Sequence, residues 1–274
     1  MQNAPLPLLL EPQQLSAHLA DAHLLILDLC SPQLYGRAHI PGAVHLPYAR
    51  LSYGQLPTPG ALPNIAQLQQ VFGEIGYQPN QHIVVYDDEG GGWAGRLIWV
   101  LDCIGHKNYS YLNGGLQAWL QDQLPTESTP HRPESTQATL TLSNDVNADK
   151  QNILAHLKDI HRIIWDARSA EEYSGMRAFA QKSGHIPGAV NYEWTRAMDR
   201  SRGLRLRPFD DIRVELAELG ITPDKEIITH CQTHHRSGFT YLLGKILGFP
   251  NIKAYPGSWA EWGNDPTTPV ETNA

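Results

Sequence analysis

The sequence predicts an α/β protein made of two tandem domains, each with a mainly parallel sheet flanked by helices. Three observations support this prediction. Short apolar runs alternate with helix-like segments, long stretches of the first half recur in the second, and a polar connector lies between the halves. With 274 residues, the chain is long enough for two domains of ordinary size.

The strand candidates are short runs rich in branched apolar residues, and each ends at a polar residue. In the first half they are residues 24–28 (LLILD) and 82–87 (HIVVYD), and in the second half residues 162–166 (RIIWD) and 226–230 (EIITH). Helix-like segments lie between them. The resulting strand–helix–strand order is typical of parallel sheets, which bind ligands at the carboxyl ends of their strands.

The clearest helix candidate follows the strand at 226–230. Its apolar residues recur every three or four positions, as on one helix face: Phe239, Leu242, Leu243, Ile246 and Leu247. Gly248 and Pro250 then provide a stop signal.

The two halves repeat each other at the level of a whole domain. The phrase HIPGAV occurs at 39–44 and again at 185–190. The run GHKNYSYLNGGLQAW at 105–119 matches GFPNIKAYPGSWAEW at 248–262, an offset of 143 residues (248 − 105). A repeat of this length is a duplicated domain and not a solenoid unit.

The boundary between the repeats is rich in Pro, Ser, Thr and Gln and has no apolar periodicity. We therefore expect domain one at residues 1–124, a linker at 125–139 and domain two at 140–274.

Composition narrows the possible functions. The net charge is −7, from 21 Lys and Arg against 28 Asp and Glu, and no basic tract favours nucleic-acid binding. The N-terminus lacks the features of a signal peptide, and the apolar runs fall short of the roughly 20 residues that span a membrane. Three separated cysteines suit a reducing compartment. We expect a cytoplasmic enzyme with no membrane or nucleic-acid partner.

The segment HCQTHHRSG at 230–238 carries the strongest chemical signal. A predicted strand ends just before Cys231, and a predicted helix begins about five residues later. Backbone N–H groups at the helix start, Arg236 and protonated His234 or His235 would all favour the thiolate form of Cys231. The same positive field would hold an anion, so the loop is suited to thiolate attack on an anionic substrate.

The loop allows three other interpretations. A buried structural cysteine does not explain the surrounding donors. A zinc site would use Cys231, His230, His234 and His235, but ligands packed this closely rarely surround a tetrahedral ion, so no metal is expected. A cysteine phosphatase or arsenate reductase has the pattern C-x5-R, whereas this loop has C-x4-R (236 − 231 = 5). The shorter loop favours attack at sulfur over attack at phosphorus.

Taken together, the motifs resemble those of a rhodanese, a thiosulfate sulfurtransferase of the two-domain type. The resemblance rests on three motifs: DARSAEEYSG…SGHIPGAV at 166–190, the strand EIITHC, and the closing YPGSWAEW. The resemblance covers nearly the whole chain, and the loop CQTHHRS is similar to that of the Azotobacter type. It implies that only the second domain is catalytic. The offset of 143 places Asp88 opposite Cys231 (231 − 143), in a loop without a nucleophile.

The resemblance also implies a mechanism. The Cys231 thiolate would take the outer sulfur of thiosulfate as a persulfide and pass it to cyanide or a thiol, with no cofactor beyond that covalent intermediate. A monomer would suffice. Mercaptopyruvate is disfavoured as a donor, because the loop lacks the small residues expected for it. A phosphatase or arsenate reductase, and a persulfide carrier or binding module, stand as alternative functions.

The expected site consists of Cys231 as catalytic residue and of substrate-binding groups around it. Arg236 is expected to bind the sulfonate end of thiosulfate. The remaining substrate-binding candidates belong to the same loop: His235, His234, Gln232, Thr233 and Ser237. An ion pair that stabilises the loop is the alternative role for Arg236. Thr233 and Ser237 alternatively cap the helix that follows, and His235 alternatively faces solvent.

Several other polar residues are expected to be structural. Asp166 should accept loop N–H bonds. Arg168 can pair with Glu171 or Glu172, and the alternative is that it lines the site. Glu172 stands where some relatives have a substrate-binding arginine.

The repeated histidines His39 and His185 should support turns, since one of them lies in the half without a nucleophile. Cys103 should lie in the core, and Cys30 should be inert. Trp194 is expected either to form a wall of the pocket or to pack in the core.

Overall fold

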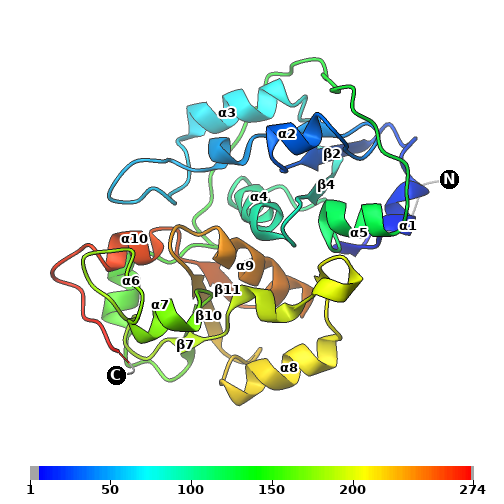
Figure 1. Ribbon diagram of the computed structural model, residues 1–274. Coiled ribbons are helices and arrows are strands. Elements are labelled where there is room, and N and C mark those ends of the chain that lie inside the picture. The colour runs from blue at the N-terminus through cyan, green and yellow to red at the C-terminus, as the bar shows by residue number, and fades with distance from the viewer. Residues whose placement is uncertain (1–5, 273–274) are drawn as a thin grey trace. The chain divides into compact units, whose positions relative to one another are not determined.

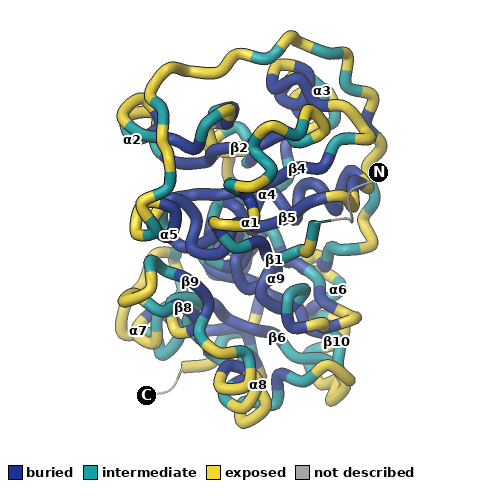
Figure 2. The backbone as a smooth tube through the Cα atoms, turned by 90° about the vertical axis from the view of Figure 1, so that its right-hand side faces the viewer, coloured by how far each residue is buried: buried dark blue, intermediate teal, exposed yellow. Residues whose placement is uncertain are grey.

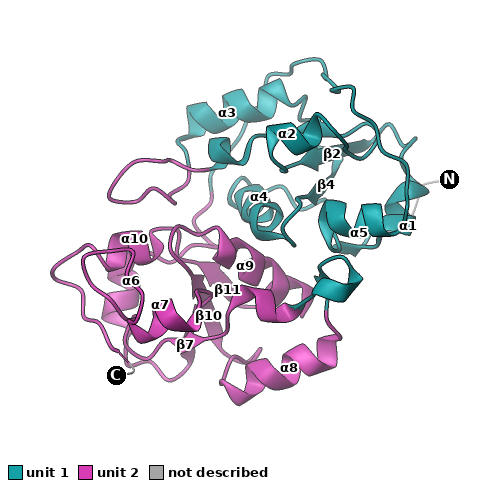
Figure 3. Ribbon diagram, viewed as in Figure 1, with its two compact units in different colours: residues 1–51, 63–142, 198–206 teal, residues 52–62, 143–197, 207–274 magenta. Residues whose placement is uncertain are grey.

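The structure is a computed structural model that describes residues 6–272, and its contacts divide the chain into two compact units (Figures 1 and 3). Unit 1 comprises residues 1–51, 63–142 and 198–206, and unit 2 comprises 52–62, 143–197 and 207–274. Each unit thus includes one short segment from the other half of the sequence. The contacts therefore assign two segments, 52–62 and 198–206, differently from a division at the linker.

Unit 1 contains a five-stranded sheet in the order β1-β5-β4-β2-β3, and every pairing in it is parallel. Its strands are β1 (Leu9–Leu10), β2 (Leu24–Asp28), β3 (Val44–His45), β4 (His82–Tyr86) and β5 (Tyr109–Leu112). Its helices are α1 (Pro12–Ser16), α2 (Pro32–Tyr35), η1 (Tyr48–Leu51), α3 (Ile65–Glu74), α4 (Gly92–Cys103) and α5 (Gly115–Gln121). The segment 198–206 adds β8 (Met198–Asp199), η3 (Arg200–Arg202) and β9 (Arg205–Leu206).

Unit 2 contains a four-stranded sheet in the order β11-β10-β6-β7, again with parallel pairing throughout. Its strands are β6 (Arg162–Asp166), β7 (Val190–Asn191), β10 (Glu226–His230) and β11 (Ile252–Ala254). Its helices are α6 (Lys150–Ala155), α7 (Ala170–Ser174), η2 (Trp194–Ala197), α8 (Phe209–Glu218), α9 (Arg236–Ile246) and α10 (Ser258–Trp262). The predicted class, two α/β domains with parallel sheets flanked by helices, is confirmed.

The strands are apolar because parallel sheets are covered on both faces. All five residues of β4 are buried, and so is nearly the whole of α4, which Figure 2 shows in the colour of buried residues. Polar residues mark where helices begin. Asn64 and Ser169 form capping boxes at α3 and α7, and Ser31 accepts a hydrogen bond from the first turn of α2.

Helix α9 begins at Arg236, five residues after Cys231, as the sequence predicts. Four of its five predicted core residues are buried, and Ile246 is half-buried. The helix ends before Gly248, whose φ of 81° is a left-handed conformation that glycine adopts without strain. The predicted strand–loop–helix arrangement at the candidate nucleophile is therefore present.

The two repeated histidines have matching structural roles. His39 Nδ1 lies 2.6 Å from the carbonyl oxygen of Tyr35, and His185 Nδ1 lies 2.8 Å from that of Tyr173. Each imidazole also stacks on the ring of the same tyrosine, at centroid distances of 3.9 and 3.8 Å. Since the same turn forms in both units, these histidines support the fold, as predicted.

The segment 198–206 is tied to unit 1 by polar contacts. Leu206 donates its N–H to Oδ1 of Asn113 at 2.9 Å, and Arg205 Nε lies 3.2 Å from Glu11 Oε2. Because Arg205 is only 7% exposed, these contacts anchor the segment firmly. Across the described part of the chain, no helix is both long and apolar enough to cross a bilayer.

Candidate active site

Cys231 follows directly after β10, at the carboxyl end of a central strand in the sheet of unit 2. The side chain is 1% exposed. Its own N–H donates to Ser258 Oγ at 3.4 Å, and its carbonyl oxygen accepts from the N–H of Trp259 at 2.9 Å. The backbone of the candidate nucleophile is thereby fixed from two sides.

The surroundings of Cys231 favour the thiolate. Burial by itself raises the pKa of the thiol. The charge of Arg236, hydrogen bonds from the side chain and backbone of Ser237, and His235 outweigh burial, so that the pKa lies below its ordinary value. The loop therefore provides what a cysteine nucleophile needs, a stabilised anion in a site sheltered from water.

Arg236 is the main cation near the sulfur, and it forms a bidentate ion pair with Glu172 of α7. Its Nη1 lies 2.5 Å from Glu172 Oε2, and its Nη2 lies 2.9 Å from Glu172 Oε1. Burial would lower the pKa of Arg236, but Glu172 and the Cys231 thiolate raise it. Two of the five N–H donors of the guanidinium are used in this pair, and three remain for other partners.

Three other predicted site residues hold the loop in shape. His234 is buried at a φ of 55°, and its Nδ1 lies 2.7 Å from Ser237 Oγ. Gln232 is half-buried and donates its side-chain N–H to the carbonyl oxygen of Phe179 at 3.3 Å. His234 thus lies inside the loop, linked to a side chain that contacts the sulfur.

His235 and Thr233 are half-buried. His235 is the residue before the first turn of α9, and its ring lies 5.7 Å from that of Trp194, measured between centroids. Trp194 also packs edge-on against Phe239 at 6.0 Å. No side-chain hydrogen bond caps the start of α9, so the alternative in which Thr233 or Ser237 caps this helix is wrong.

The sister loop of unit 1 corrects one prediction. In the sheet of unit 1, Asp28 of β2 lies beside Tyr86 of β4 in the strand register. In the sheet of unit 2, Asp166 of β6 lies beside His230 of β10 in the same way. The residue after Tyr86 is Asp87, so Asp87 and not Asp88 is the counterpart of Cys231. The repeat offset is 144 in this stretch (231 − 87) and becomes 143 only after helix α4, which is one residue longer than α9.

Asp87 fills the loop of unit 1 with its own carboxylate. Oδ1 accepts hydrogen bonds from the N–H groups of Glu89, Gly90 and Gly91 at 3.2, 3.1 and 2.8 Å, and Oδ2 accepts from Ala94 at 3.0 Å. Burial raises the pKa of Asp87 to about 7, although these four donors favour the ionised form. This fold can therefore surround two acceptor atoms with backbone N–H groups, at the place where unit 2 has its cysteine.

A buried polar network lies behind Cys231. Arg168 is 1% exposed, and its guanidinium contacts both carboxylate oxygens of Asp166 and the carbonyl oxygen of Gly184. The predicted pairing of Arg168 with Glu171 or Glu172 is wrong, because the guanidinium turns back onto Asp166. Burial lowers the pKa of His230 to about 4, so the imidazole is neutral at pH 7. As predicted, Asp166 and Arg168 are structural.

The other cysteines are not placed to react. Cys30 and Cys103 are both fully buried and belong to unit 1. Burial and the carboxylate of Asp28 raise the pKa of Cys30 far above its ordinary value. These findings agree with the expectation that Cys103 lies in the core and that Cys30 is inert.

Three contributors to the site escaped sequence analysis. Ser258 contacts the N–H of Cys231 and has a φ of 52°, at the repeat position of Gly115 (258 − 143), which has a φ of 57°. A glycine at this repeat position was the sequence signal that could have pointed to the unusual backbone of Ser258. Phe179 and Gly60 contact the loop from distant parts of the sequence, and no local pattern marks them.

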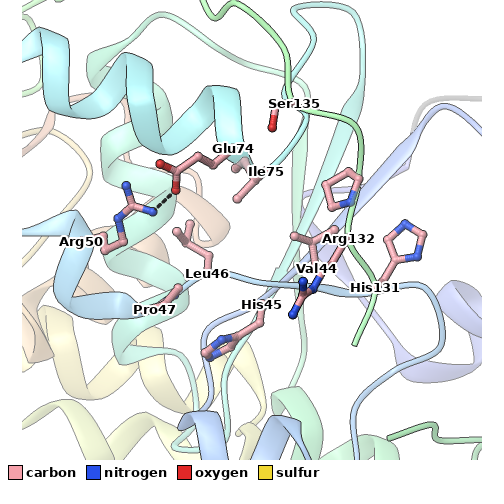
Figure 4. A pocket seen from close by; sticks show the side chains of 11 residues that line it. Val44, His45, Leu46, Pro47, Arg50, Glu74, Ile75, His131, Arg132 and Ser135 are labelled. Carbon is pink, nitrogen blue, oxygen red and sulfur yellow. Dashed lines mark hydrogen bonds and ion pairs between the residues drawn. The ribbon is translucent and has the colours of Figure 1, made fainter. Parts of the chain in front are cut away.

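Within residues 6–272, no group of three or more His, Cys, Asp or Glu side chains could hold a metal ion. The zinc interpretation of the loop therefore has no geometric support. A pocket of about 340 Å³ lies in unit 1, where Arg50, Glu74 and Arg132 are among the lining residues (Figure 4). This pocket contains none of the predicted site residues.

Comparison with known proteins agrees with this geometry. A family model described as the rhodanese-like domain matches residues 11–122 and 149–265. The chain is 53% identical over 268 residues to a thiosulfate sulfurtransferase of Azotobacter vinelandii, covering 98% of both chains. It is 51% identical to a thiosulfate sulfurtransferase of Pseudomonas aeruginosa, with 97% of both chains covered.

More distant matches share the architecture. A sulfur carrier protein of Thermus thermophilus is 29% identical over 267 residues, with 92% of each chain covered. Among solved structures, an anaerobic ergothioneine biosynthesis enzyme from Chlorobium limicola superposes with a TM-score of 0.81 at 21% identity. That match covers 92% of this chain and 65% of the Chlorobium enzyme. At this low identity, it supports the fold alone.

Proposed function

The chain belongs to the rhodanese-like domain family, and on that premise we propose that it is a thiosulfate sulfurtransferase whose nucleophile is Cys231. The observation that carries the proposal is a buried cysteine whose thiol pKa is lowered by Arg236 and Ser237, at the carboxyl end of a central strand. Near-complete coverage at 53% and 51% identity to two thiosulfate sulfurtransferases supports the same activity.

In the first half-reaction, the Cys231 thiolate attacks the outer sulfur of thiosulfate. A new S–S bond forms to Cys231, the S–S bond of thiosulfate breaks, and sulfite leaves with the electron pair of that bond. The product is a cysteine persulfide with a charged outer sulfur. N–H groups of the loop from Gln232 to Ser237 stabilise that charge, much as four N–H groups surround the carboxylate of Asp87 in unit 1.

In the second half-reaction, cyanide or a thiolate attacks the outer sulfur, and Cys231 leaves as the thiolate. With cyanide the product is thiocyanate, so sulfur moves by double displacement and the kinetics are ping-pong. The persulfide is the only added group this chemistry requires.

The substrate-binding roles follow from position. Arg236 keeps three N–H donors beyond its pair with Glu172, and these suit the sulfonate oxygens of thiosulfate. His235 adds a donor at the start of α9, beside Trp194. His234, Gln232, Thr233 and Ser237 shape the loop that receives the anion.

Intact-protein mass spectrometry tests this proposal. After incubation with thiosulfate, the protein gains the mass of one sulfur atom, and cyanide removes it. The Cys231→Ala variant gains nothing, and the matched Cys103→Ala variant gains sulfur like the unchanged protein. Absence of the adduct, or its location on Cys30 or Cys103, contradicts the proposal.

The proposal also covers the cellular compartment, the oligomeric state and the partners of the enzyme. We propose a cytoplasmic monomer that acts on a small sulfur donor and on cyanide or thiol acceptors, without nucleic-acid or membrane partners. Its three cysteines are free thiols, which suits a reducing compartment. Size-exclusion chromatography with light scattering tests the monomer.

A further inference from the structure

The ion pair between Glu172 and Arg236 joins the helix after β6 to the catalytic loop. Glu172 is 4% exposed and is held from two directions. Its carboxylate binds both Nη atoms of Arg236 and also accepts the N–H of Ser169 at 3.3 Å, in the capping box of α7. A buried carboxylate thus lies next to the main cation that stabilises the Cys231 thiolate.

The sister unit shows that the helix does not require this carboxylate. Asp28 corresponds to Asp166, an offset of 138 (166 − 28), so Leu34 stands in the place of Glu172. Helix α2 still begins with the same cap, in which Leu34 donates its N–H to Ser31 Oγ at 3.3 Å. Gly92 stands in the place of Arg236, as the first residue of α4. Both partners of the ion pair are therefore absent from unit 1, where Asp87 stands in the place of Cys231.

The reaction sets two opposite demands on the charge of the loop. An anionic donor must bind and the thiolate must be stable, but sulfite must also leave after each transfer. Arg236, the N–H groups of the loop and the start of α9 all attract anions. Without a nearby negative charge, this field would hold the sulfite product as well as the substrate.

We propose that Glu172 is a positioning residue that holds Arg236 beside Cys231 and offsets its charge, so that the loop binds thiosulfate without retaining sulfite. This inference rests on the proposed function and adds a residue that sets the anion affinity of the same site. The carboxylate acts through Arg236 and does not touch the reacting sulfur atoms.

The test compares Glu172→Gln with the unchanged protein. Glutamine keeps an oxygen that can accept from Arg236 and can still serve in the capping box, but it carries no charge. The KM for thiosulfate and the inhibition constant of sulfite both decrease, each by about fivefold, because one charge near the anion is removed. The kcat decreases, because sulfite leaves more slowly.

Two variants serve as controls. Glu171→Gln makes the same chemical change on the exposed neighbour of Glu172 and leaves all three constants unchanged. Glu172→Asp keeps the charge, and its sulfite inhibition constant stays within about twofold of the unchanged protein. A purely structural role would lower the melting temperature of Glu172→Gln and leave KM and sulfite inhibition unchanged or weaker, and that result overturns the inference.

A direct measurement of sulfite binding tests the role of Glu172 independently of the proposed function. Calorimetry on the Cys231→Ala forms of the protein, with and without Glu172→Gln, measures affinity without turnover. Tighter binding in the double variant supports the inference, and equal or weaker binding overturns it. If the unchanged protein takes no sulfur from thiosulfate, the proposed function fails, while the affinity comparison still decides the role of Glu172.

Discussion

Cys231 shows how opposing effects on one thiol are decided by a few neighbours. Burial opposes the thiolate, and a cysteine as buried as Cys30, next to Asp28, has its pKa raised far above the ordinary value. Cys231 is just as buried, yet its pKa is lowered, because Arg236 and Ser237 face the sulfur. The difference between an inert and a reactive cysteine in this chain is therefore the sign of the charge beside it.

Arg236→Gln tests this balance. Loss of the cation raises the thiol pKa, so a smaller fraction of Cys231 is thiolate at pH 7. The rate of alkylation by iodoacetamide at pH 7 falls about tenfold for each unit by which the thiol pKa rises. The midpoint of the pH profile of this rate moves to higher pH. The Arg213→Gln variant removes a cation from helix α8 that does not belong to the loop, and it keeps the original profile. An unshifted midpoint in Arg236→Gln would rule out this role.

Asp87 is the corresponding residue of unit 1, where a carboxylate accepts four backbone N–H bonds. Asp87→Ala leaves these buried donors without their acceptor and destabilises unit 1 by about 2–4 kcal/mol. Urea unfolding followed by tryptophan fluorescence measures the loss. Sulfur uptake by Cys231, measured per folded molecule, remains, since Asp87 is not part of unit 2.

At the scale of elements, the catalytic loop is supported by segments far from it in sequence. A methyl group on Gly60 would lie 2.3 Å from the carbonyl oxygen of Thr233 and 2.6 Å from that of Pro256. Both distances are far shorter than a contact between carbon and oxygen allows, and both neighbours are backbone atoms. The segment 52–62 therefore packs against the loop so closely that only glycine fits.

Gly60→Ala should disturb the loop more than it disturbs the fold. The added methyl group pushes Thr233 and changes the placement of the N–H groups near Cys231, so sulfur transfer falls at least tenfold, an effect of about 1.4 kcal/mol on the barrier. Steady-state kinetics with thiosulfate and cyanide measure the fall. Gly36→Ala is the matched control, since its methyl group would meet no atom closer than 3.4 Å. Equal activity in both variants would show that the contact is unimportant.

At the scale of the whole molecule, the two compact units do not coincide with the two halves of the sequence. Unit 2 includes the segment 52–62 from the first half, and unit 1 includes 198–206 from the second. The linker region around 125–139 is thus not the only connection between the repeats. Neither repeat contains all the contacts of the unit to which it contributes most.

Residues 140–274 produced alone should therefore be a poor enzyme, although they contain every predicted site residue. Without Gly60 and its neighbours, the loop loses a backbone contact at Thr233. We expect less than about a tenth of the activity of the full chain and a lower melting temperature. Kinetics and calorimetry on the two proteins measure this. Full activity in the shorter protein would show that segment 52–62 is not required.

Much of the fold and of the chemistry follows from local sequence. The branched apolar runs determine the strands, the spacing from Phe239 to Leu247 determines a helix face, and the duplicated phrases determine the two repeats. Cys231 was identifiable because the residue types around it favour a thiolate and its position after a strand predicts a loop at the edge of the sheet. These features depend on residues that are close in sequence, where periodicity and charge can be interpreted directly.

The partners of the site residues were decided only by tertiary structure. Arg168 pairs with Asp166, and Arg236 pairs with Glu172. The strand registers make Asp87 the counterpart of Cys231. A side-chain pairing depends on which segments meet in space, and Glu172 and Arg236 are 64 positions apart in sequence. The contact of Gly60 with Thr233 has no local signal at all. The sequence by itself therefore determined the nucleophile and the architecture, while packing decided how the loop is held and how its charge is balanced.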